Sequence, residues 1–199
     1  DRIVVNDVVL NLTPGTITVV VGESGAGKTT LLKALAGLEA GDVQCGPKAC
    51  VYVQQQPIVF TNSVGAELML THRLFPDLPP SGKAYSDLFQ LNELAHQGTA
   101  ELSGGERQRM VLARQFSLAP SLLLLDECTS NLGWLHVQMI ERELLRLKEG
   151  GVCIVMVTHN IPQAHRLADT IVVLREGKAL QIDDPFAASL LKGEWIDHE

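Results

Sequence analysis

The 199-residue sequence has no apolar run near the roughly 20 residues that a helix needs to cross a bilayer. Any membrane association is therefore expected to go through a partner, and no signal peptide is recognisable. Basic residues are also scarce, 16 against 23 acidic ones, which gives a formal net charge of −7. Without a global positive field the chain does not attract nucleic acid, and we expect no such partner.

Cysteine is rare and does not form a metal-binding pattern. Cys45 and Cys50 are spaced too widely for a tight metal pair, and no histidine cluster accompanies them. Cys153 lies within an apolar segment. This usage indicates reduced thiols in a cytosolic protein. The chain is 46% hydrophobic, enough for the core of one domain, or of one domain with a small lobe.

The stretch from Ile17 to Leu38 has the organisation of a phosphate-binding loop. The β-branched run Ile17 to Val21 predicts a buried strand, which breaks at Gly22 and is followed by a helix with Lys28 in its first turn. The spacing G-x-x-x-x-G-K-T is that of a P-loop in its required strand–loop–helix context. The alternative is an ordinary glycine-rich turn, for which a chance match is on the order of one in a hundred.

Each residue type in this loop suits a polyphosphate. Glycines let the backbone approach the phosphates and aim N–H groups at them, and the helix N-terminus adds unpaired donors. Lys28 is predicted to reach the β- and γ-phosphates, and the Thr29 hydroxyl to bind Mg²⁺. The predicted nucleotide-binding residues are Gly22, Glu23, Ser24, Gly25, Ala26, Gly27, Lys28, Thr29 and Thr30.

A second helix start resembles an anion site. Ser103 with Glu106 three residues later is a capping-box pattern, which places Ser103 at the N-cap of a helix through about Ser117. The simpler interpretation is a well-capped helix. Capping does not require Gly104 and Gly105, but two glycines are useful where a backbone approaches an anion closely.

Polar residues end two apolar strands. The run Leu122 to Leu125 predicts a parallel strand buried on both faces and ends in Asp126 and Glu127, where open α/β sheets bind ligands. Asp126 can hold Mg²⁺ and Glu127 can polarise an attacking water. The strand Val152–Val157 brings His159 to the same edge, where it could contact the γ-phosphate. The alternatives are a solvated acidic strand end and an ordinary hydrogen-bonded histidine.

The remaining pattern predicts alternating strands and helices. Residues 3–12 alternate loosely and suggest a strand pairing with Ile17–Val21, and Cys50–Val53 suggests another after a polar link at 41–48. Between 63 and 102, leucines and prolines indicate a small inserted helical lobe, with one helix around Val64, Leu68 and Leu70 and another around Leu88, Leu91 and Leu94.

The C-terminal half continues the alternation. A helix with one buried stripe is expected to end at Gly150-Gly151, its apolar residues being Leu135, Met139, Ile140, Leu144 and Leu147. Asn160 and Pro162 start a short helix, and Glu176-Gly177 turns a terminal hairpin. The order predicts a three-layer α/β domain with a largely parallel sheet. Its expected parts are an ATPase core (1–62 and 103–184), a helical lobe (63–102) and a tail (185–199), whose Phe186, Leu190, Leu191 and Trp195 suggest core packing or a docking helix.

Taken together, these motifs resemble the ATP-binding subunit of ABC transporters over nearly the whole chain. Gly22 to Thr29 is similar to the Walker A motif, and Gln54-Gln55-Gln56 to the Q-loop, with Gln55 best aligned. The stretch 102–106 resembles the family signature, Leu122 to Glu127 resembles Walker B with the catalytic glutamate, and His159 resembles the switch histidine.

The resemblance implies a mechanism beyond the spacing itself. Two copies of the chain would enclose two ATP molecules head to tail, each bound by Walker A of one copy and by Ser103, Gly104, Gly105 and Glu106 of the other. Lys28, Gln55, Glu127 and His159 would be the catalytic residues, and Thr29, Gln55 and Asp126 the Mg²⁺ ligands. The lobe at 63–102 would grip integral membrane permease subunits on the inner face of the cell membrane. An isolated monomer should bind ATP but hydrolyse it poorly.

Four departures from the family pattern stand out. Glu106 replaces the usual glutamine, and Gly133 replaces the usual aspartate, which affects either helix capping or communication between the two ATP sites. The link before the Q-loop is short, so the antiparallel β lobe looks trimmed. No aromatic residue precedes Tyr52, so the adenine-stacking aromatic is missing or lies before Asp1.

Three functions compete on this evidence. The first is the ATPase of a membrane importer for a small solute, with an oxyanion or a metal ion as a weak guess. The second is a soluble ABC-type ATPase acting on nucleic acid or ribosomes, although such proteins usually carry tandem cassettes or long coiled coils. The third, prompted by Gly133, is a poorly hydrolysing ATP-binding module. Glu127 and His159 favour hydrolysis.

Overall fold

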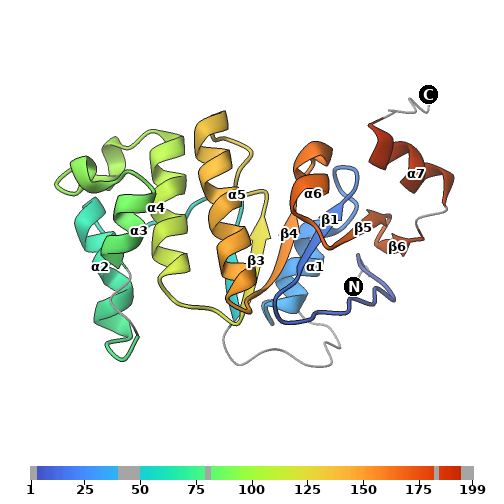
Figure 1. Ribbon diagram of the computed structural model, residues 1–199, viewed down its shortest axis with the longest axis horizontal. Helices are drawn as coiled ribbons and strands as arrows, with labels where there is room; N and C mark the ends of the chain where they lie inside the picture. The colour runs from blue at the N-terminus through green and yellow to red at the C-terminus, as the bar shows by residue number, and fades with distance from the viewer. Residues whose placement is uncertain (1–3, 40–49, 79–81, 182–183, 194–199) are drawn as a thin grey trace. The chain divides into compact units, whose positions relative to one another are not determined.

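The structure is a computed structural model that describes residues 4–39, 50–78, 82–181 and 184–193 (Figure 1). Contacts divide the chain into two compact units. The first unit comprises Asp1–Tyr52, Ser121–Glu127 and Leu147–Glu199, and the second comprises Val53–Pro120 and Cys128–Arg146. The expected lobe at 63–102 falls inside the second unit, and its proposed boundaries stay a prediction. No helix in the described ranges is both long and apolar enough to cross a membrane.

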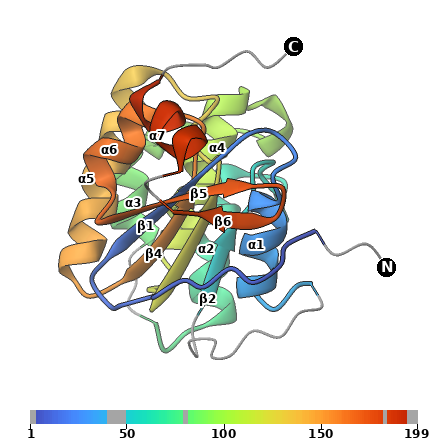
Figure 2. The ribbon, with the colours of Figure 1, turned by 90° about the vertical axis from the view of Figure 1, so that its right-hand side faces the viewer.

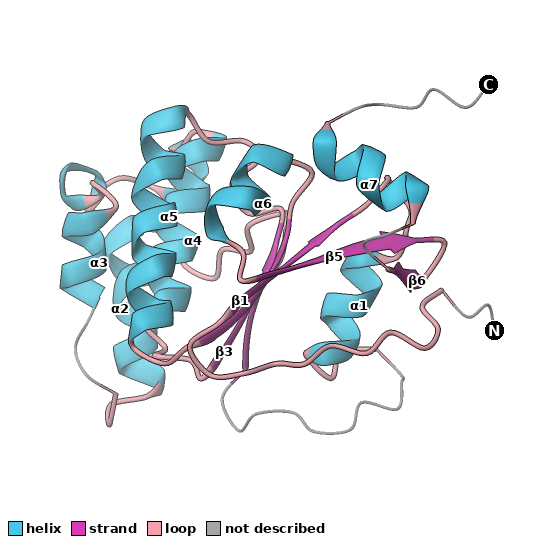
Figure 3. Ribbon diagram, turned by 45° about the vertical axis from the view of Figure 1, so that its right-hand side comes forward, coloured by secondary structure: helices cyan, strands magenta, loops and turns pink. Residues whose placement is uncertain are grey.

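A six-stranded sheet forms the centre of the first unit, in the order β2-β3-β4-β1-β5-β6. Figure 3 shows its strands in magenta. Strand β3 pairs with β4, β4 with β1, and β1 with β5, all in parallel, whereas β5 and β6 pair antiparallel. The predicted largely parallel sheet is confirmed. The strands are β1 (Ile17–Val21), β2 (Cys50–Val53), β3 (Leu122–Asp126), β4 (Cys153–Val157), β5 (Thr170–Arg175) and β6 (Lys178–Leu180).

The apolar strands are buried on both faces, as their continuous runs predicted. Every residue of β1, β3 and β4 is buried. Helix α1 (Lys28–Leu35) packs Leu31 and Leu32 into a cluster with alternate sheet residues such as Val20 and Leu124. Helix α6 (Ile161–Leu167), capped by Asn160 as predicted, contacts β1. Figure 2 shows α1 and α6 on opposite sides of the sheet, which gives the expected three layers.

The strand predicted over residues 3–12 is wrong for the described residues 4–12, which have no strand. Both edges of β1 are already taken by β4 and β5, so no edge remains for another partner. Instead, Val5, Val8, Leu10 and Leu12 pack against the core cluster, and the Asn6 N–H donates to the Gly177 carbonyl at 2.8 Å. The alternation of apolar and polar residues in this segment therefore reflects side-chain packing against the core and not strand pairing. The polar link at 41–48 lies outside the described residues.

The second unit is helical in the expected lobe region. Helix α2 is confirmed, but the second helix, predicted around Leu88, Leu91 and Leu94, is misplaced: α3 ends at Leu88, and Gln90 has φ of +55°, which no helix continues through. Leu91 is nevertheless fully buried, and Leu94 lies in a separate 3₁₀ turn. The helices of this unit are α2 (Val64–Leu74), α3 (Gly82–Leu88), α4 (Gly104–Phe116) and most of α5 (Trp134–Glu149).

Helix α5 carries the predicted buried stripe in Ile140, Leu144 and Leu147, whereas Met139 is half-buried and Leu135 is not part of it. Ile140 and Leu144 are fully buried, but Leu135 is 75% exposed. Leu135 precedes Ile140 by five residues and so lies about 140° around the helix from it. Val137, three residues before Ile140, is buried in its place. The predicted hairpin forms from β5 and β6, and the tail forms α7 (Pro185–Lys192), where Phe186 stacks on the Arg175 guanidinium at 4.1 Å.

A buried ion pair within the second unit fixes the segment before α2. Glu67 of α2 is fully buried and pairs with Arg114 of α4. Its carboxylate also accepts from the Phe60 N–H at 3.1 Å and from the Thr61 N–H at 2.9 Å. Arg114 in turn donates to the Ile58 carbonyl at 3.1 Å. Two charged side chains thereby hold the loop that follows the Q-loop stretch.

Candidate functional site

The P-loop joins the end of β1 to the start of α1, as predicted. The strand ends at Val21, the helix begins at Lys28, and Gly27 at the N-cap has the left-handed φ of +100°. The first N–H groups of a helix have no partner within it, so those at the start of α1 remain available for an anion. The loop therefore has the backbone geometry that a phosphate group needs.

Gly22 is required by its surroundings. Its φ is +154°, and a Cβ atom built on it would lie 2.1 Å from the Leu174 carbonyl oxygen of β5. That oxygen belongs to the backbone of the central sheet and cannot move aside cheaply. The loop can leave β1 along this path only if residue 22 has no side chain.

We expect Gly22→Ala to destabilise the first unit by more than about 2 kcal/mol, because strain of one to three kcal/mol is combined with a backbone clash. Thermal unfolding would measure the change. Gly104→Ala is the matched control, because a Cβ there meets nothing within 4 Å and its φ is not positive. Equal melting temperatures for Gly22→Ala and the parent chain would refute the steric argument.

Lys28 lies folded over this loop. Its side chain is buried, and Nζ donates to the Gly22 carbonyl at 2.8 Å and the Glu23 carbonyl at 2.7 Å. Burial lowers the pKa of Lys28, while the charges of Glu127, Asp126 and Glu23 oppose that shift. The charges of the two carboxylates thus favour the protonated form of Lys28.

Asp126 and Glu127 end β3 in different environments. Asp126 is 2% exposed and accepts a hydrogen bond from the Tyr52 hydroxyl at 3.1 Å. Burial and the neighbouring Asp126 raise the pKa of Tyr52 well above its usual value. The role of Tyr52 could not be predicted from the sequence, because nothing in its short strand shows that β2 lies beside β3. Tyr52 therefore orients Asp126.

Glu127 has an unusual backbone. Its φ is +46°, and its N–H donates to the Val157 carbonyl of β4 at 3.1 Å. Non-glycine residues in this region are strained and often lie at functional sites. His159 approaches it: Nδ1 of His159 lies 3.4 Å from Oε2 of Glu127, and the imidazole is 63% exposed. A carboxylate beside an accessible imidazole can receive a proton from water.

The second unit holds the other predicted site residues. The capping box is confirmed: the Ser103 hydroxyl accepts from the Glu106 N–H, and the Glu106 carboxylate accepts from the Ser103 N–H. A Cβ on Gly104 would meet nothing within 4 Å, and one on Gly105 would make only an ordinary contact, 3.6 Å from Leu132. Packing inside the chain therefore does not require these glycines, although each weakens a helix by roughly 1 kcal/mol relative to alanine.

Gln55 is exposed in the irregular segment after β2 and also belongs to the second unit. Gly133 stands at the start of α5, where its carbonyl accepts from the His136 and Val137 N–H groups at 2.9 and 3.1 Å. The structure thus places Lys28, Asp126, Glu127 and His159 in the first unit, and Gln55 with Ser103–Glu106 in the second. The roles of all these residues stay predictions.

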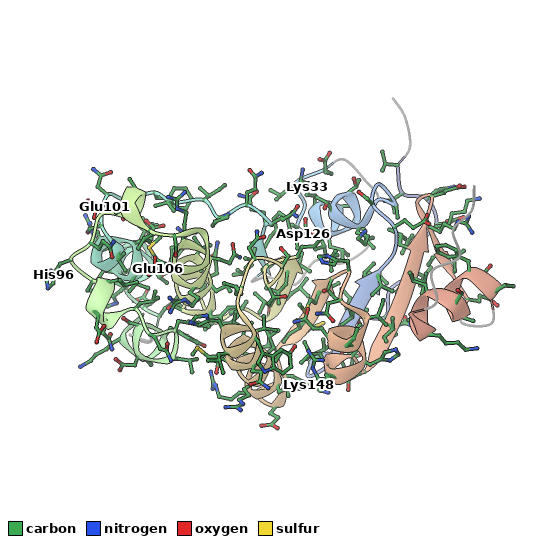
Figure 4. All side chains as sticks on the ribbon, turned by 90° about the horizontal axis from the view of Figure 1, so that it is seen from above. Lys33, His96, Glu101, Glu106, Asp126 and Lys148 are labelled. Atoms are coloured by element: carbon green, nitrogen blue, oxygen red, sulfur yellow. The ribbon has the colours of Figure 1, made fainter. Side chains whose placement is uncertain are left out.

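A glycine-rich loop between a parallel strand and a helix, with a buried lysine and an aspartate ending a nearby strand, defines a P-loop nucleotide hydrolase. Figure 4 labels this aspartate, Asp126. The family model described as "ABC transporter" matches residues 5–130. The chain belongs to this family of ATP-binding proteins and is an ATPase, so the resemblance is confirmed.

Similar proteins include ATP-binding proteins named for import. The aliphatic sulfonates import ATP-binding protein SsuB 1 of Paracoccus denitrificans is 40% identical over 89% of this chain and 75% of its own length. The sulfate/thiosulfate import ATP-binding protein CysA 1 of Chromobacterium violaceum is 33% identical over 93% and 58%. The Fe(3+) ions import ATP-binding protein FbpC of Haemophilus influenzae is 34% identical over 92% and 58%.

A solved structure described as the ATP-binding subunit of an ABC transporter has the same fold. It superposes with a TM-score of 0.76, covering 96% of this chain and 88% of its own, at 23% identity. At that identity the likeness concerns the fold alone, and it agrees with the predicted P-loop core and mostly parallel sheet.

Proposed function

We propose that this chain is the Mg²⁺-dependent ATP-hydrolysing subunit of an ABC importer for a small solute. The observation that carries the hydrolytic part is the buried Lys28 at the P-loop, whose Nζ donates to the Gly22 and Glu23 carbonyls, together with the buried Asp126 at the end of β3. Import is supported by the names of the relatives, which concern sulfonates, sulfate or thiosulfate, and Fe(3+) ions. The corresponding solute is an oxyanion or a metal ion.

Within the first unit, ATP phosphates would lie against the free N–H groups at the start of α1. Lys28 Nζ would exchange its two loop carbonyls for β- and γ-phosphate oxygens. The Thr29 hydroxyl is exposed, and the Asp126 carboxylate is oriented by Tyr52, so both provide the oxygen ligands that Mg²⁺ prefers. Magnesium would supply charge neutralisation at the phosphates.

The described residues contain no group of three His, Cys, Asp or Glu side chains arranged to hold a metal ion. Oxygen ligands from Thr29 and Asp126, with Gln55 as the third predicted ligand, would suit Mg²⁺, since this ion usually keeps several waters and completes its shell with substrate phosphates. The donor set therefore favours a cation that arrives with the nucleotide over a resident structural metal.

Glu127 would accept the proton of the attacking water, and His159 would hold the carboxylate and the γ-phosphate in register. The positive φ of Glu127 and its bond to Val157 fix the backbone from which the carboxylate projects. The backbone next to His159 is fixed to β1, because the Thr158 N–H donates to the Val20 carbonyl at 3.3 Å. General-base catalysis of this kind contributes typically 10²- to 10⁴-fold.

A second copy of the chain would complete each site. The glycines at the start of α4 make no packing contact that requires them, so their role lies outside the chain, where a ligand must approach the backbone closely. The N-terminus of α4, a 13-residue helix, is suited to a phosphate group. In a head-to-tail dimer, Ser103 and Gly105 of one copy would contact the ATP held by the other.

The permease partner would contact the second unit around the segment that follows Gln55. Ile58 and Phe60 are 47% and 66% exposed although Glu67 and Arg114 bond their backbone. Arg114 also stacks on the Phe60 ring at 4.8 Å from its centroid. A loop held this firmly that nevertheless presents apolar side chains is suited to a protein partner. Gln55 would connect this contact with the nucleotide site.

We expect Lys28→Met to weaken ATP binding at least about tenfold and to abolish hydrolysis, because a buried ammonium that contacts the phosphates is lost. Equilibrium binding of a fluorescent ATP analogue and a phosphate-release assay would measure the two effects. Lys33→Met, on the exposed side of the same helix, is the control and should bind as the parent does. ATP affinity unchanged in Lys28→Met would contradict the assignment.

Capture from detergent-solubilised membranes tests the transport assignment. The tagged chain should retain an integral membrane protein, and the double variant Ile58→Ser with Phe60→Ser should lose it while hydrolysing ATP at the basal rate. Salt-sensitive binding of nucleic acid without a membrane partner would instead support a soluble ATPase.

A further inference from the structure

The Ser103 hydroxyl is already engaged by the neighbouring Glu106. Ser103 Oγ donates to Glu106 Oε2 at 2.6 Å, and the same carboxylate oxygen accepts from the Ser103 N–H at 2.9 Å. Ser103 Oγ accepts in return from the Glu106 N–H at 3.3 Å. A serine hydroxyl has a single proton to donate, and here the carboxylate receives it.

A phosphate oxygen would compete for this proton. In the dimer proposed above, Ser103 of one copy faces the phosphates held by the other, and a phosphate oxygen is also an acceptor. It can bond the hydroxyl only if that hydroxyl turns away from Glu106. The two hydrogen bonds from Ser103 also lower the pKa of Glu106, so the carboxylate carries its negative charge at neutral pH.

At position 106, the negative charge of glutamate is what distinguishes it from glutamine, since the two side chains have nearly the same shape. Glutamate and glutamine serve equally in a capping box at this position, so α4 does not need a charge at residue 106. A carboxylate within hydrogen-bond reach of Ser103 is a few ångströms from any group that Ser103 binds. Two negative groups at that distance repel each other, and salt weakens the repulsion when the site is open to solvent.

We propose that Glu106 restrains closure of the ATP-bound dimer by holding the Ser103 hydroxyl and by repelling the phosphates that this hydroxyl must contact. Glu106 is a positioning residue in this proposal, because it acts through Ser103. The proposal rests on the head-to-tail dimer of the proposed function and adds a specific brake to it. The ATP-bound dimer of this chain is therefore weaker, and more dependent on salt, than that of a chain with glutamine at this position.

Sedimentation of hydrolysis-deficient chains with MgATP tests this brake. In a Glu127→Gln background, addition of Glu106→Gln should tighten ATP-driven dimerisation about three- to tenfold at 50 mM NaCl. The gain should shrink to less than about twofold at 500 mM NaCl, where the charges are screened. Glu93→Gln is the control for net charge, as an exposed residue of the same unit in a 3₁₀ turn, and should change the dimer less than about twofold.

Melting temperatures separate the brake from a structural effect. Because glutamine preserves the capping box, Glu106→Gln should melt within about 2 °C of the parent. If the parent chain dimerises with MgATP and Glu106→Gln dimerises equally or more weakly, the proposed restraint by Glu106 is refuted and the proposed function stays intact. If neither chain dimerises with MgATP, the composite site fails, and the role of Glu106 fails with it.

Discussion

Replacement of Glu127 by glutamine is expected to reduce ATP hydrolysis at least about 10²-fold while ATP binding remains. Glutamine has nearly the same shape but cannot accept the proton of the attacking water, and general-base catalysis accounts for typically 10²- to 10⁴-fold in rate. Lys28 and the start of α1, which bind the phosphates in this account, are untouched. Phosphate release and equilibrium ATP binding, measured on the same preparation, check the two halves of the prediction.

The chain offers a matched control for this variant. Glu176 is also a glutamate with positive φ, +49°, and lies in the exposed turn between β5 and β6. Glu176→Gln removes the same charge from a comparable backbone and should hydrolyse ATP at the parental rate. Turnover of Glu127→Gln close to that of Glu176→Gln would show that Glu127 is not the base.

Replacement of Glu67 by alanine is expected to destabilise the second unit by about 3–5 kcal/mol, the cost of leaving a buried charge without its partner. Arg114 would remain buried, and burial already lowers its pKa. The N–H groups of Phe60 and Thr61 would also lose their acceptor. Urea unfolding followed by circular dichroism measures the loss, and Glu93→Ala on an exposed turn should stay within about 0.5 kcal/mol of the parent.

A double replacement separates the two contributions. Changing both Glu67 and Arg114 to methionine removes the unpaired charge but still leaves the loop donors unsatisfied. Its stability should therefore lie between that of Glu67→Ala and the parent. A Glu67→Ala variant as stable as the parent would mean that this pair contributes nothing and that another interaction holds the loop.

The sequence was sufficient for elements whose cause is local. The runs at 17–21 and 122–125 form buried parallel strands because every residue is apolar or β-branched. The capping box at Ser103 and the N-cap at Asn160 form because each side chain bonds its own backbone a few residues on. These features need no knowledge of the rest of the fold.

The failures have different physical causes. Residues 4–12 alternate like a strand, but β4 and β5 occupy both edges of β1. The leucine spacing across 88–94 resembles one helix, although Gln90 breaks it. Leu135 fits a helical stripe in composition but lies on the wrong face. Local patterns do not show which edge or face is already taken.

In the candidate site too, some residues could be predicted from local sequence patterns and others could not. Lys28 was predicted from the spacing of the P-loop, and Asp126, Glu127 and His159 because they follow strands that a parallel sheet brings to one edge. Two contacts were not predicted. Tyr52 and Asp126, which form a hydrogen bond, are 74 positions apart in the sequence, and Glu67 and Arg114, which form an ion pair, are 47 positions apart. No local pattern indicates such contacts, since Tyr52 reads as an ordinary strand residue and Glu67 as an ordinary exposed helix residue.

Sedimentation of the Glu127→Gln chain with MgATP tests the central claim most directly, namely that a second copy completes the nucleotide site. With MgATP the chain should sediment as a dimer of twice its 21.6 kDa, and without nucleotide as a monomer. Addition of Ser103→Ala should weaken the dimer while ATP still binds each chain. A Glu127→Gln chain that binds ATP and yet remains monomeric at all accessible concentrations would contradict the account.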